Sequence, residues 1–138
     1  MAGQSSEWAP VASGIPQGSV LGPVLFVCYI NYLPDTISSF SYMYADDSKI
    51  FKVNLDADGK ALQDDLEKLC AWAVEWQLHF NVGKCKIVHM RTENARADMS
   101  MVDGTRHTLR EKTSLEKDLR IWFSNTMKPT DHVTHAVN

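Results

Sequence analysis

Two adjacent carboxylates are the residues best suited to chemistry, in the run Tyr44-Ala45-Asp46-Asp47. Neighbouring aspartates in a turn repel each other unless a positive charge lies between them. Mg²⁺ suits such a position because it prefers carboxylate oxygens and leaves room for substrate phosphates. Two ions held in this way stabilise the attacking and leaving oxygens of a phosphoryl transfer. The alternative is a plain surface turn, where aspartate is common because of its local hydrogen bonds.

A β-hairpin is predicted to carry this pair of carboxylates at its tip. Aromatic residues alternate with other residues at Phe40, Tyr42 and Tyr44, and the alternation resumes after the turn with Phe51 and Val53. A period of two is typical of a strand, and a short acidic turn joins such strands tightly. The sequence therefore predicts two antiparallel strands on either side of the aspartates.

An amphipathic helix is predicted to follow the hairpin. Its apolar positions step by four, three, four and three residues, at Leu62, Leu66, Leu69, Ala73 and Trp76. This spacing places them in one stripe of an otherwise acidic helix, with Trp72 at its margin. The stripe indicates core packing and not a binding surface.

Further elements are predicted on both sides of this region. Residues 17–32 form an apolar helix whose regular part begins near Gly22–Pro23, because proline is accepted in a first helical turn. A strand spans Cys85–His89, another lies within Leu119–Phe123, and residues 130–138 begin a further helix.

The composition is that of one soluble globular domain. The chain has 138 residues, 44% hydrophobic and 22% charged, with a formal net charge of −3, which excludes wholesale disorder and fibrous repeats. The longest apolar run, Val20–Ile30, is shorter than the about 20 residues that a membrane span needs. No signal peptide is visible, and the three cysteines show no disulfide spacing. We therefore expect an intracellular protein, nuclear or cytoplasmic, with no membrane partner.

Charge is unevenly distributed along the chain. Residues 1–80 carry four lysines and ten acidic residues, whereas residues 81–138 carry ten basic and seven acidic residues. Nucleic-acid binders usually present a basic surface, because neutralising phosphates supplies much of their affinity. Only the C-terminal part could provide one, and on charge alone a solvated surface of mixed charge is favoured.

Four blocks of sequence together resemble one known family. They are SGIPQGSVLGPVLFVCYIN, YADDSKIF, WQLHFNVGKCK and EKDL, in this order. In these motifs and their spacing the chain resembles the reverse transcriptase domain of non-LTR (long interspersed element) retrotransposons, over about residues 8–138. The resemblance implies an RNA-directed DNA polymerase that uses dNTPs, an RNA template and a DNA primer, with Mg²⁺ as cofactor and Mn²⁺ as its substitute.

The resemblance also implies roles for single residues. Asp46 would be the metal-binding catalytic aspartate, and Asp47 its less demanding neighbour at the same metal. Lys84 would protonate the departing pyrophosphate, which requires a pKa near the working pH. Tyr44 and Ala45 would border the primer end and the incoming nucleotide.

Two further segments acquire implied roles. Gln17 and Gly18 match the segment that closes over the nucleotide, where glycine lets the backbone approach closely. Residues Leu119–Trp122 resemble the primer grip, a hairpin that supports the 3′ end of the primer. Arg120 stands where the family usually has glycine, and it would cost about 1 kcal/mol if the backbone there has positive φ.

The implied fold is α+β: a partial polymerase palm followed by a primer-grip-like hairpin. The palm resembles a ferredoxin-like β-α-β-β-α-β arrangement that lacks its first, central strand. We predict a disordered N-terminus over residues 1–6, the palm fragment over residues 7–105, and over residues 106–138 the hairpin with an incomplete start of a thumb. Loss of the central strand would open two sheet edges. Residues 7–13, missing palm and fingers segments, or a second chain would have to fill the gap.

Two functions are compatible with these motifs. The family takes another metal-binding aspartate from a strand upstream of the first block, where this chain has only one acid, Glu7. We therefore expect a fragment of an RNA-directed DNA polymerase, with two-metal nucleotidyl transfer in the parent enzyme and no appreciable synthesis by these 138 residues alone. The alternative is a non-catalytic palm remnant that binds nucleic acid or a protein partner.

Overall fold

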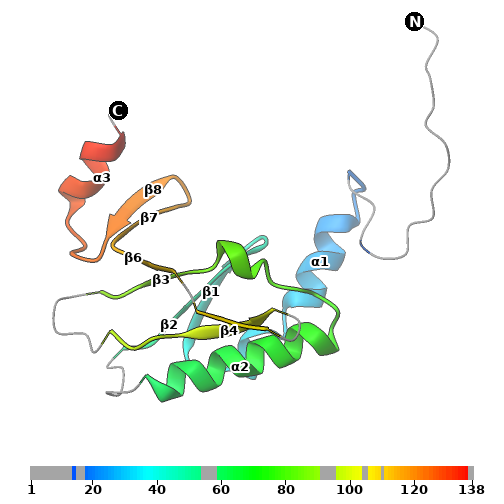
Figure 1. The fold of residues 1–138 in the computed structure, drawn as a ribbon. Coiled ribbons are helices and arrows are strands. Elements are labelled where there is room, and N and C mark those ends of the chain that lie inside the picture. Colours follow the sequence, from blue (N-terminus) through cyan, green and yellow to red (C-terminus); the bar gives the residue numbers. More distant parts are fainter. Residues whose placement is uncertain are drawn as a thin grey trace, which may run out of the picture. The chain divides into compact units, whose positions relative to one another are not determined.

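The computed structural model describes residue 14 and residues 18–53, 59–90, 96–103, 106–109 and 111–136. The chain divides into two compact units, Met1–Tyr32 and Leu33–Asn138. In the described residues the first unit contains one helix, and the second contains short sheets and two α-helices (Figure 1). The predicted disordered N-terminus, residues 1–6, lies outside the described residues.

Helix α1 (Gly22–Ile30) begins where the sequence predicts it to begin. Pro23 lies in its first turn, where the missing N–H group would have no helical partner. The Ser19 hydroxyl accepts a hydrogen bond from the Gly22 N–H at 2.9 Å and so satisfies another free donor of this turn. Most of its side chains are exposed, Val27 among them. Among the described residues, no helix has the length and apolarity needed to cross a bilayer.

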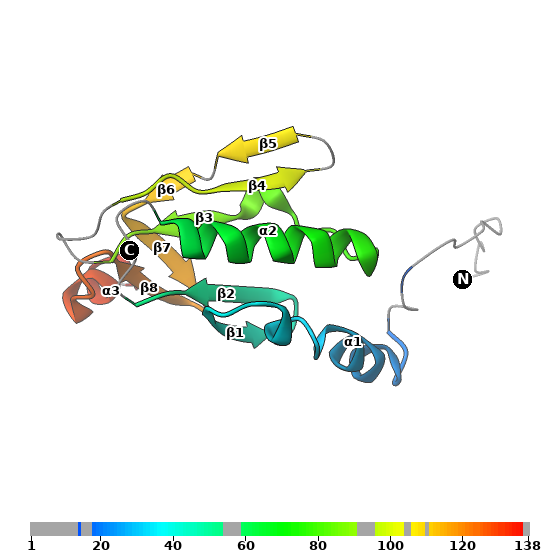
Figure 2. The same ribbon diagram turned by 90° about the horizontal axis from the view of Figure 1, so that it is seen from below.

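The second unit is built from two-stranded sheets. Its strands in the described residues are β1 (Phe40–Tyr44), β2 (Asp47–Phe51), β3 (Lys86–Val88), β4 (Ser100–Asp103), β5 (Arg106–Leu109), β6 (Glu111–Thr113), β7 (Leu115–Asp118) and β8 (Ile121–Ser124). The pairs β1–β2, β4–β5 and β7–β8 are antiparallel, whereas β3–β6 is parallel (Figures 1 and 2). Together with the helices these sheets make a mixed α+β fold, which confirms the predicted class.

Helix α2 (Lys60–Glu75) contributes to the core of this unit through one face. The side chains buried on that face are Asp65, Leu69, Trp72 and Ala73. The predicted stripe is therefore correct at Leu69 and Ala73. It is wrong for the tryptophans, because the stripe included Trp76 and placed Trp72 only at its margin. Trp72 is buried, whereas Trp76 follows the last helical residue and stays half-buried, with its ring stacked on Trp72 at 5.7 Å between centroids.

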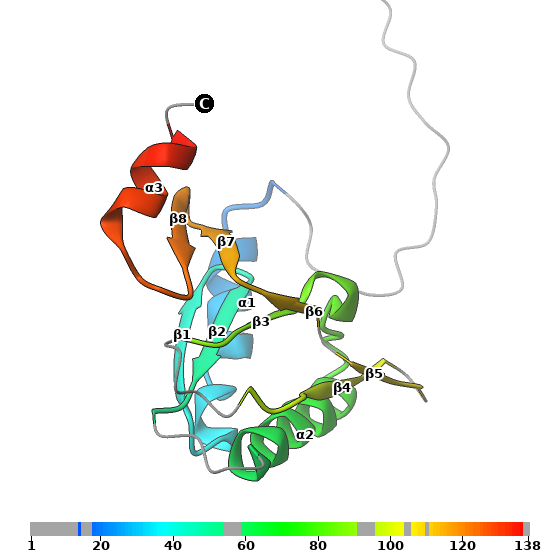
Figure 3. The ribbon, with the colours of Figure 1, turned by 60° about the vertical axis from the view of Figure 1, so that its left-hand side comes forward.

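Strand β4 lies along α2 (Figure 3). The Gln63 carboxamide accepts a hydrogen bond from the Ser100 N–H at 2.9 Å and donates one to the Ser100 carbonyl at 3.1 Å. A side chain of α2 therefore satisfies both backbone groups at the start of β4. Met99 and Met101 on either side are buried, so this contact closes the core.

The hairpin β7–β8 corrects a predicted strand. The sequence predicts Leu119 within a strand over Leu119–Phe123, but Leu119 forms the turn with Arg120, and β8 begins at Ile121. Both turn residues have positive φ, 44° at Leu119 and 69° at Arg120, as a tight two-residue hairpin turn of type I′ requires. Neither is a usual turn residue, so the apolar pattern extended the predicted strand across the turn.

Helix α3 (Pro129–Ala136) packs on β8, which confirms the helix predicted at this end of the chain. The Trp122 N–H donates to His132 Nδ1 at 3.1 Å. The Asp131 carboxylate accepts hydrogen bonds from the Ser124 and Thr126 hydroxyls. These hydrogen bonds lower the pKa of Asp131, and the bond from Ser124 has the larger effect.

Candidate active site

The predicted pair of aspartates lies at the tip of the β1–β2 hairpin. Tyr44 pairs with Asp47 in the strand register, so only Ala45 and Asp46 form the turn. Ala45 has a φ of 53°, in the left-handed region that two-residue hairpin turns use. Asp46 is therefore a turn residue and Asp47 is the first residue of β2, and both are exposed.

Aromatic rings cover one face of this hairpin. The Phe51 ring stacks on Phe40 with 5.4 Å between centroids and on Tyr42 with 5.5 Å. Phe40 is 63% exposed and Tyr42 67%, so the stack faces solvent. Cross-strand aromatic pairs stabilise a hairpin, which matters because two strands alone are marginally stable. We refer to Phe40, Tyr42 and Phe51 as the aromatic stack.

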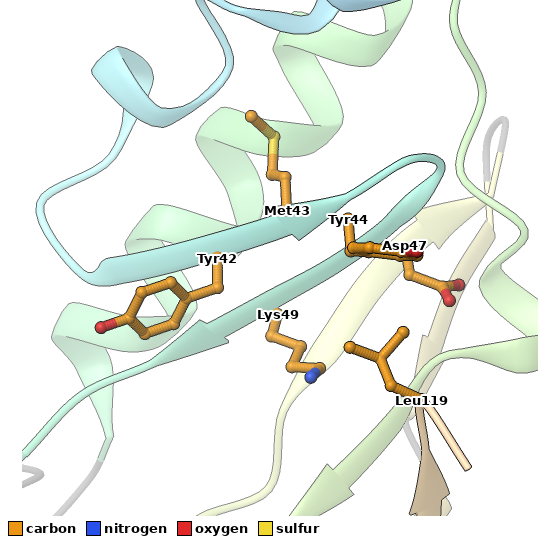
Figure 4. Close-up of a pocket in the computed structure, with 6 residues that line it drawn as sticks. All are labelled: Tyr42, Met43, Tyr44, Asp47, Lys49 and Leu119. Carbon is orange, nitrogen blue, oxygen red and sulfur yellow. The ribbon is translucent and has the colours of Figure 1, made fainter.

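A shallow hollow of about 190 Å³ opens beside the aspartates. Its lining residues are Tyr42, Met43, Tyr44, Asp47, Lys49 and Leu119 (Figure 4). Figure 4 shows Met43 directed away from the side on which Tyr42 and Lys49 lie, while Leu119 approaches Lys49 from the β7–β8 turn. The hollow thus lies between the hairpin and the turn that follows β7.

An ion pair joins the aspartate hairpin to β7. The Lys49 ammonium contacts the Asp118 carboxylate, and the two side chains are 43% and 25% exposed. An ion pair this accessible contributes at most about 1 kcal/mol to stability. Its effect is chiefly geometric, because it places the β7–β8 turn, and with it Leu119, against the face that carries Tyr42.

Lys84, the predicted acid, ends the short helix η2 (Val82–Lys84) and is exposed. Its N–H donates to the Asn81 carbonyl at 2.9 Å, and the buried Val82 side chain anchors the turn. Within the described part of the chain, no hydrogen bond or ion pair joins Lys84 to Asp46 or Asp47. Its role in catalysis stays a prediction.

A second ion pair starts at the next strand. The Lys86 ammonium, at the start of β3, contacts the Glu116 carboxylate of β7 at 3.1 Å. The hydrogen bond to Glu116 and the negative charge of that residue raise the pKa of Lys86. Strand β7 thus carries two acids, Glu116 and Asp118, that bind lysines from different strands.

The predicted nucleotide segment lies partly outside the described residues. Gln17 is not among them, whereas Gly18 has a φ of 83°, which only glycine adopts without strain. Gly18 belongs to the first unit, and the aspartate hairpin to the second. Binding of nucleotide or primer by Gln17, Gly18, Tyr44 and Ala45 therefore stays a prediction.

Asp46 and Asp47 could supply part of a divalent-metal site. Mg²⁺ keeps several waters and is commonly held by one or two carboxylates together with substrate phosphates, which two exposed, adjacent aspartates can provide. No cluster of three or more His, Cys, Asp or Glu side chains in the described residues is placed to hold a metal. The turn therefore fits an ion with two protein ligands whose remaining positions go to water or phosphate oxygens.

A buried carboxylate that the apolar pattern alone does not predict holds the hairpin on the core. Asp65 of α2 accepts hydrogen bonds from the N–H and hydroxyl of Ser39 at 2.8 and 2.7 Å. It also accepts bonds from the N–H and hydroxyl of Ser38 and from the Lys68 ammonium. Ser39 immediately precedes β1, so Asp65 fixes the point at which the hairpin begins.

The sequence holds a signal for this contact. Asp65 lies three residues after Leu62 and four before Leu69, in the middle of the apolar stripe. A buried charge requires several partners, and the paired hydroxyls of Ser38 and Ser39 are available before β1. No comparable signal marks Lys49 and Asp118, because their pairing depends on how distant segments pack.

Comparisons with known proteins agree with the motifs. The chain matches the family described as reverse transcriptase (RNA-dependent DNA polymerase) over residues 1–128. It is 32% identical over 93 residues to the RNA-directed DNA polymerase from mobile element jockey of Drosophila melanogaster, covering 60% of this chain and 10% of that protein. The RNA-directed DNA polymerase from mobile element jockey of Drosophila funebris is 32% identical over 85 residues, which cover 54% of this chain and 9% of that protein. No solved structure matches the chain significantly.

The matched relatives are much longer than this chain. The probable RNA-directed DNA polymerase from transposon X-element of Drosophila melanogaster is 32% identical over 81 residues, which cover 54% of this chain and 9% of that protein. The chain thus spans about a tenth of the length of the curated relatives it matches. These mobile-element polymerases confirm the resemblance predicted from the four blocks. Since the family match extends over nearly all of the sequence, the chain belongs to the reverse transcriptase (RNA-dependent DNA polymerase) family.

Proposed function

We propose that the chain forms the metal-binding part of an RNA-directed DNA polymerase of the non-LTR retrotransposon type. The observation that carries this proposal is the two-residue turn of the β1–β2 hairpin, which holds Asp46 at its tip and Asp47 at the start of β2, both exposed. These carboxylates would hold Mg²⁺, or Mn²⁺ in its place. When bound, the ion supplies stabilisation of the negative charge on the attacking and leaving oxygens.

Other residues of the chain would bind and orient the reactants. Tyr44 and Ala45 adjoin the aspartates, so they would border the 3′ end of the DNA primer and the dNTP paired with the RNA template. Gln17 and Gly18 would contact the nucleotide. Lys84 would donate a proton to the departing pyrophosphate, since a positioned lysine can act as a general acid.

We infer that this chain alone does not extend a primer. Two-metal transfer needs carboxylates that reach both ions, and the described residues place only Asp46 and Asp47 at the turn. The hairpin β1–β2 and strand β3 belong to different sheets, which is compatible with a palm whose central strand comes from elsewhere. Exposed apolar side chains on α1 and the aromatic stack also suit coverage by missing palm and fingers segments or by a second chain.

The aromatic stack supports a second candidate function, non-catalytic binding of nucleic acid. Exposed rings on a strand pair offer flat surfaces on which bases stack, at roughly 1–3 kcal/mol per base. Fluorescence anisotropy with a labelled oligo(rU) would detect this binding. Replacing Tyr42→Leu is expected to weaken it several-fold, whereas Asp46→Asn is expected to leave it unchanged or stronger.

Binding of a metal ion to the ¹⁵N-labelled chain tests the first proposal. Mn²⁺ is expected to broaden the NMR amide signals of Ala45, Asp46 and Asp47 before those of other residues, because a bound paramagnetic ion relaxes nearby nuclei. Asp46→Asn should abolish the selective broadening. Asp35→Asn, which removes an exposed carboxylate in another turn, should leave it intact. Broadening that is indifferent to Asp46→Asn would rule out the metal site.

Primer extension tests the inferred inactivity separately. Oligo(dT) annealed to poly(rA) is incubated with the folded chain and dTTP, with Mg²⁺ and then with Mn²⁺. We expect no extended product. A product that disappears in the Asp46→Asn variant would show that the chain is active on its own, so that the inferred inactivity is wrong while the polymerase assignment is right.

A further inference from the structure

We propose that two acids of β7, Glu116 and Asp118, are positioning residues that set the Asp46–Asp47 turn relative to Lys84. We call these two residues the β7 acid pair. The inference rests on the proposed function, because that function requires the aspartates and Lys84 to act on one nucleotide. Neither acid is assigned contact with substrate or metal.

Backbone pairing does not set this spacing in the described residues. Strand β2 pairs with β1, whereas β3, which follows Lys84, pairs with β6. The hairpin with Asp46 and Asp47 and the strand that follows Lys84 therefore belong to different sheets, so side-chain contacts are left to link them. The β7 acid pair provides contacts to both.

Each lysine bound by the β7 acid pair lies two residues after a predicted catalytic residue. Lys49 follows Asp47 along β2 and contacts Asp118. Lys86 follows Lys84 and contacts Glu116 at 3.1 Å. Residues two apart in an extended segment are separated by roughly 7 Å, so a shift of either lysine displaces the predicted catalytic residue that precedes it.

The geometry of β7 suits this role. Glu116 and Asp118 are two residues apart, so both lie on one face of the strand. Lys117 lies on the opposite face, with its ammonium 5.6 Å from the centre of the Trp122 ring, and Trp122 in turn contacts α3. Strand β7 is therefore held through Lys117 on one face, while Glu116 and Asp118 on the other face bind Lys86 and Lys49.

The turn after the β7 acid pair reaches the aspartates as well. Leu119, which follows Asp118, lines the hollow together with Tyr44 and Asp47 (Figure 4). When Lys49 and Asp118 are joined, Leu119 is placed against the hairpin. A nuclear Overhauser effect (NOE) between Leu119 methyl groups and the Tyr44 ring thus reports on this placement, without a metal or a substrate.

Neutral variants of the full 138-residue chain test the proposal by NMR. Asp118→Asn is expected to remove the NOEs from Leu119 to Tyr44, and Glu116→Gln to remove those between the side chains at positions 116 and 86. Asp64→Asn is the matched control, because it neutralises another accessible acid that pairs with a lysine, Lys60, at 3.0 Å. It should leave both sets of NOEs unchanged.

A charge reversal separates positioning from general loss of structure. Lys49→Asp combined with Asp118→Lys should restore the Leu119 NOEs that each single change removes, with a cooperative melt in all variants. The proposal is overturned if Asp118→Asn keeps these NOEs, if the reversal fails to restore them, or if Asp118→Asn also abolishes the cooperative melt. Broadening of the Ala45–Asp47 signals by Mn²⁺ tests the proposed metal site separately from these NOEs. The metal site can therefore fail while the positioning role holds, and the reverse.

Discussion

The buried Asp65 carboxylate of α2 accepts hydrogen bonds from both the N–H and the hydroxyl of Ser39, at 2.8 and 2.7 Å. Ser39 is the last residue before β1, so one side chain of the core helix fixes the start of the aspartate hairpin. A carboxylate removed from water is tolerated only when hydrogen bonds replace its hydration. Ser38 and Lys68 supply the remaining bonds.

Replacing this carboxylate should destabilise the fold strongly. Asp65→Ala leaves the buried Ser39 donors without an acceptor and also removes the bonds from the exposed Ser38, and we expect a loss of about 3 kcal/mol in the free energy of unfolding. Urea unfolding followed by tryptophan fluorescence measures it, since Trp72 lies on the same face of α2. The neighbouring Asp64→Asn, on the exposed side, should change stability by no more than about 0.5 kcal/mol. Equal losses in both variants would contradict a special role for Asp65.

Stability should fall in acid because of the same group. Burial raises the pKa of Asp65, but hydrogen bonds from Ser39, Lys68 and Ser38 outweigh this effect and hold the pKa well below its usual range. The folded protein thus binds a proton less readily than the unfolded chain, whose aspartates titrate near pH 3.9. The stabilisation is therefore present above about pH 4 and is lost as the pH falls toward the folded value.

Urea unfolding at a series of pH values tests this linkage. Between about pH 5 and pH 2.5 the wild-type chain should lose more stability than Asp65→Asn, which cannot titrate at this position. Asp98 and Asp131 also have lowered pKa values and contribute to both curves, so the difference between the curves isolates Asp65. If the two plots of stability against pH ran parallel, ionisation of the Asp65 carboxylate would not stabilise the fold.

Relief of backbone strain at the β7–β8 turn should stabilise the protein. Arg120 has a φ of 69°, and glycine adopts such a conformation without the steric penalty of a Cβ atom. We expect Arg120→Gly to raise the free energy of unfolding by about 1 kcal/mol, as measured by urea unfolding. Arg120→Ala, which removes the same long side chain and keeps the Cβ, should give no gain. A similar gain from both variants would point to the arginine side chain and not to φ.

Local patterns in the sequence predicted the elements whose contacts are local. The alternation of Phe40, Tyr42 and Tyr44 identified β1, and the acidic break after it predicted a turn over Ala45–Asp47, which the structure narrows to Ala45 and Asp46 because Asp47 already pairs with Tyr44. The start of α1 followed from Pro23 because the rule behind it concerns one turn of helix. In each case the deciding interaction spans only a few residues.

Contacts between distant residues were not predictable in the same way. The parallel pairing of Lys86–Val88 with Glu111–Thr113 involves a polar segment without any strand pattern of its own. The turn at Leu119 was missed because an apolar residue with positive φ resembles part of a strand. Likewise, the aspartates of the candidate site follow from their motif, whereas the Lys49–Asp118 contact depends on packing across 69 residues of sequence.

The contact between β8 and α3 should depend on the hydrogen-bond acceptor that His132 provides. His132 Nδ1 accepts a hydrogen bond from the Trp122 N–H at 3.1 Å, and a leucine at this position has no acceptor. His132→Leu should therefore leave that donor unpaired and weaken the docking of α3 by about 1 kcal/mol. Hydrogen exchange followed by NMR should show roughly five-fold faster exchange at Trp122 and in α3. His132→Asn, whose side-chain carbonyl can accept the same bond, should exchange nearly as slowly as the wild type. Equal exchange in the leucine and wild-type proteins would mean that Trp122 and α3 are held by other contacts, such as the His135 ring on the Trp122 indole at 5.3 Å.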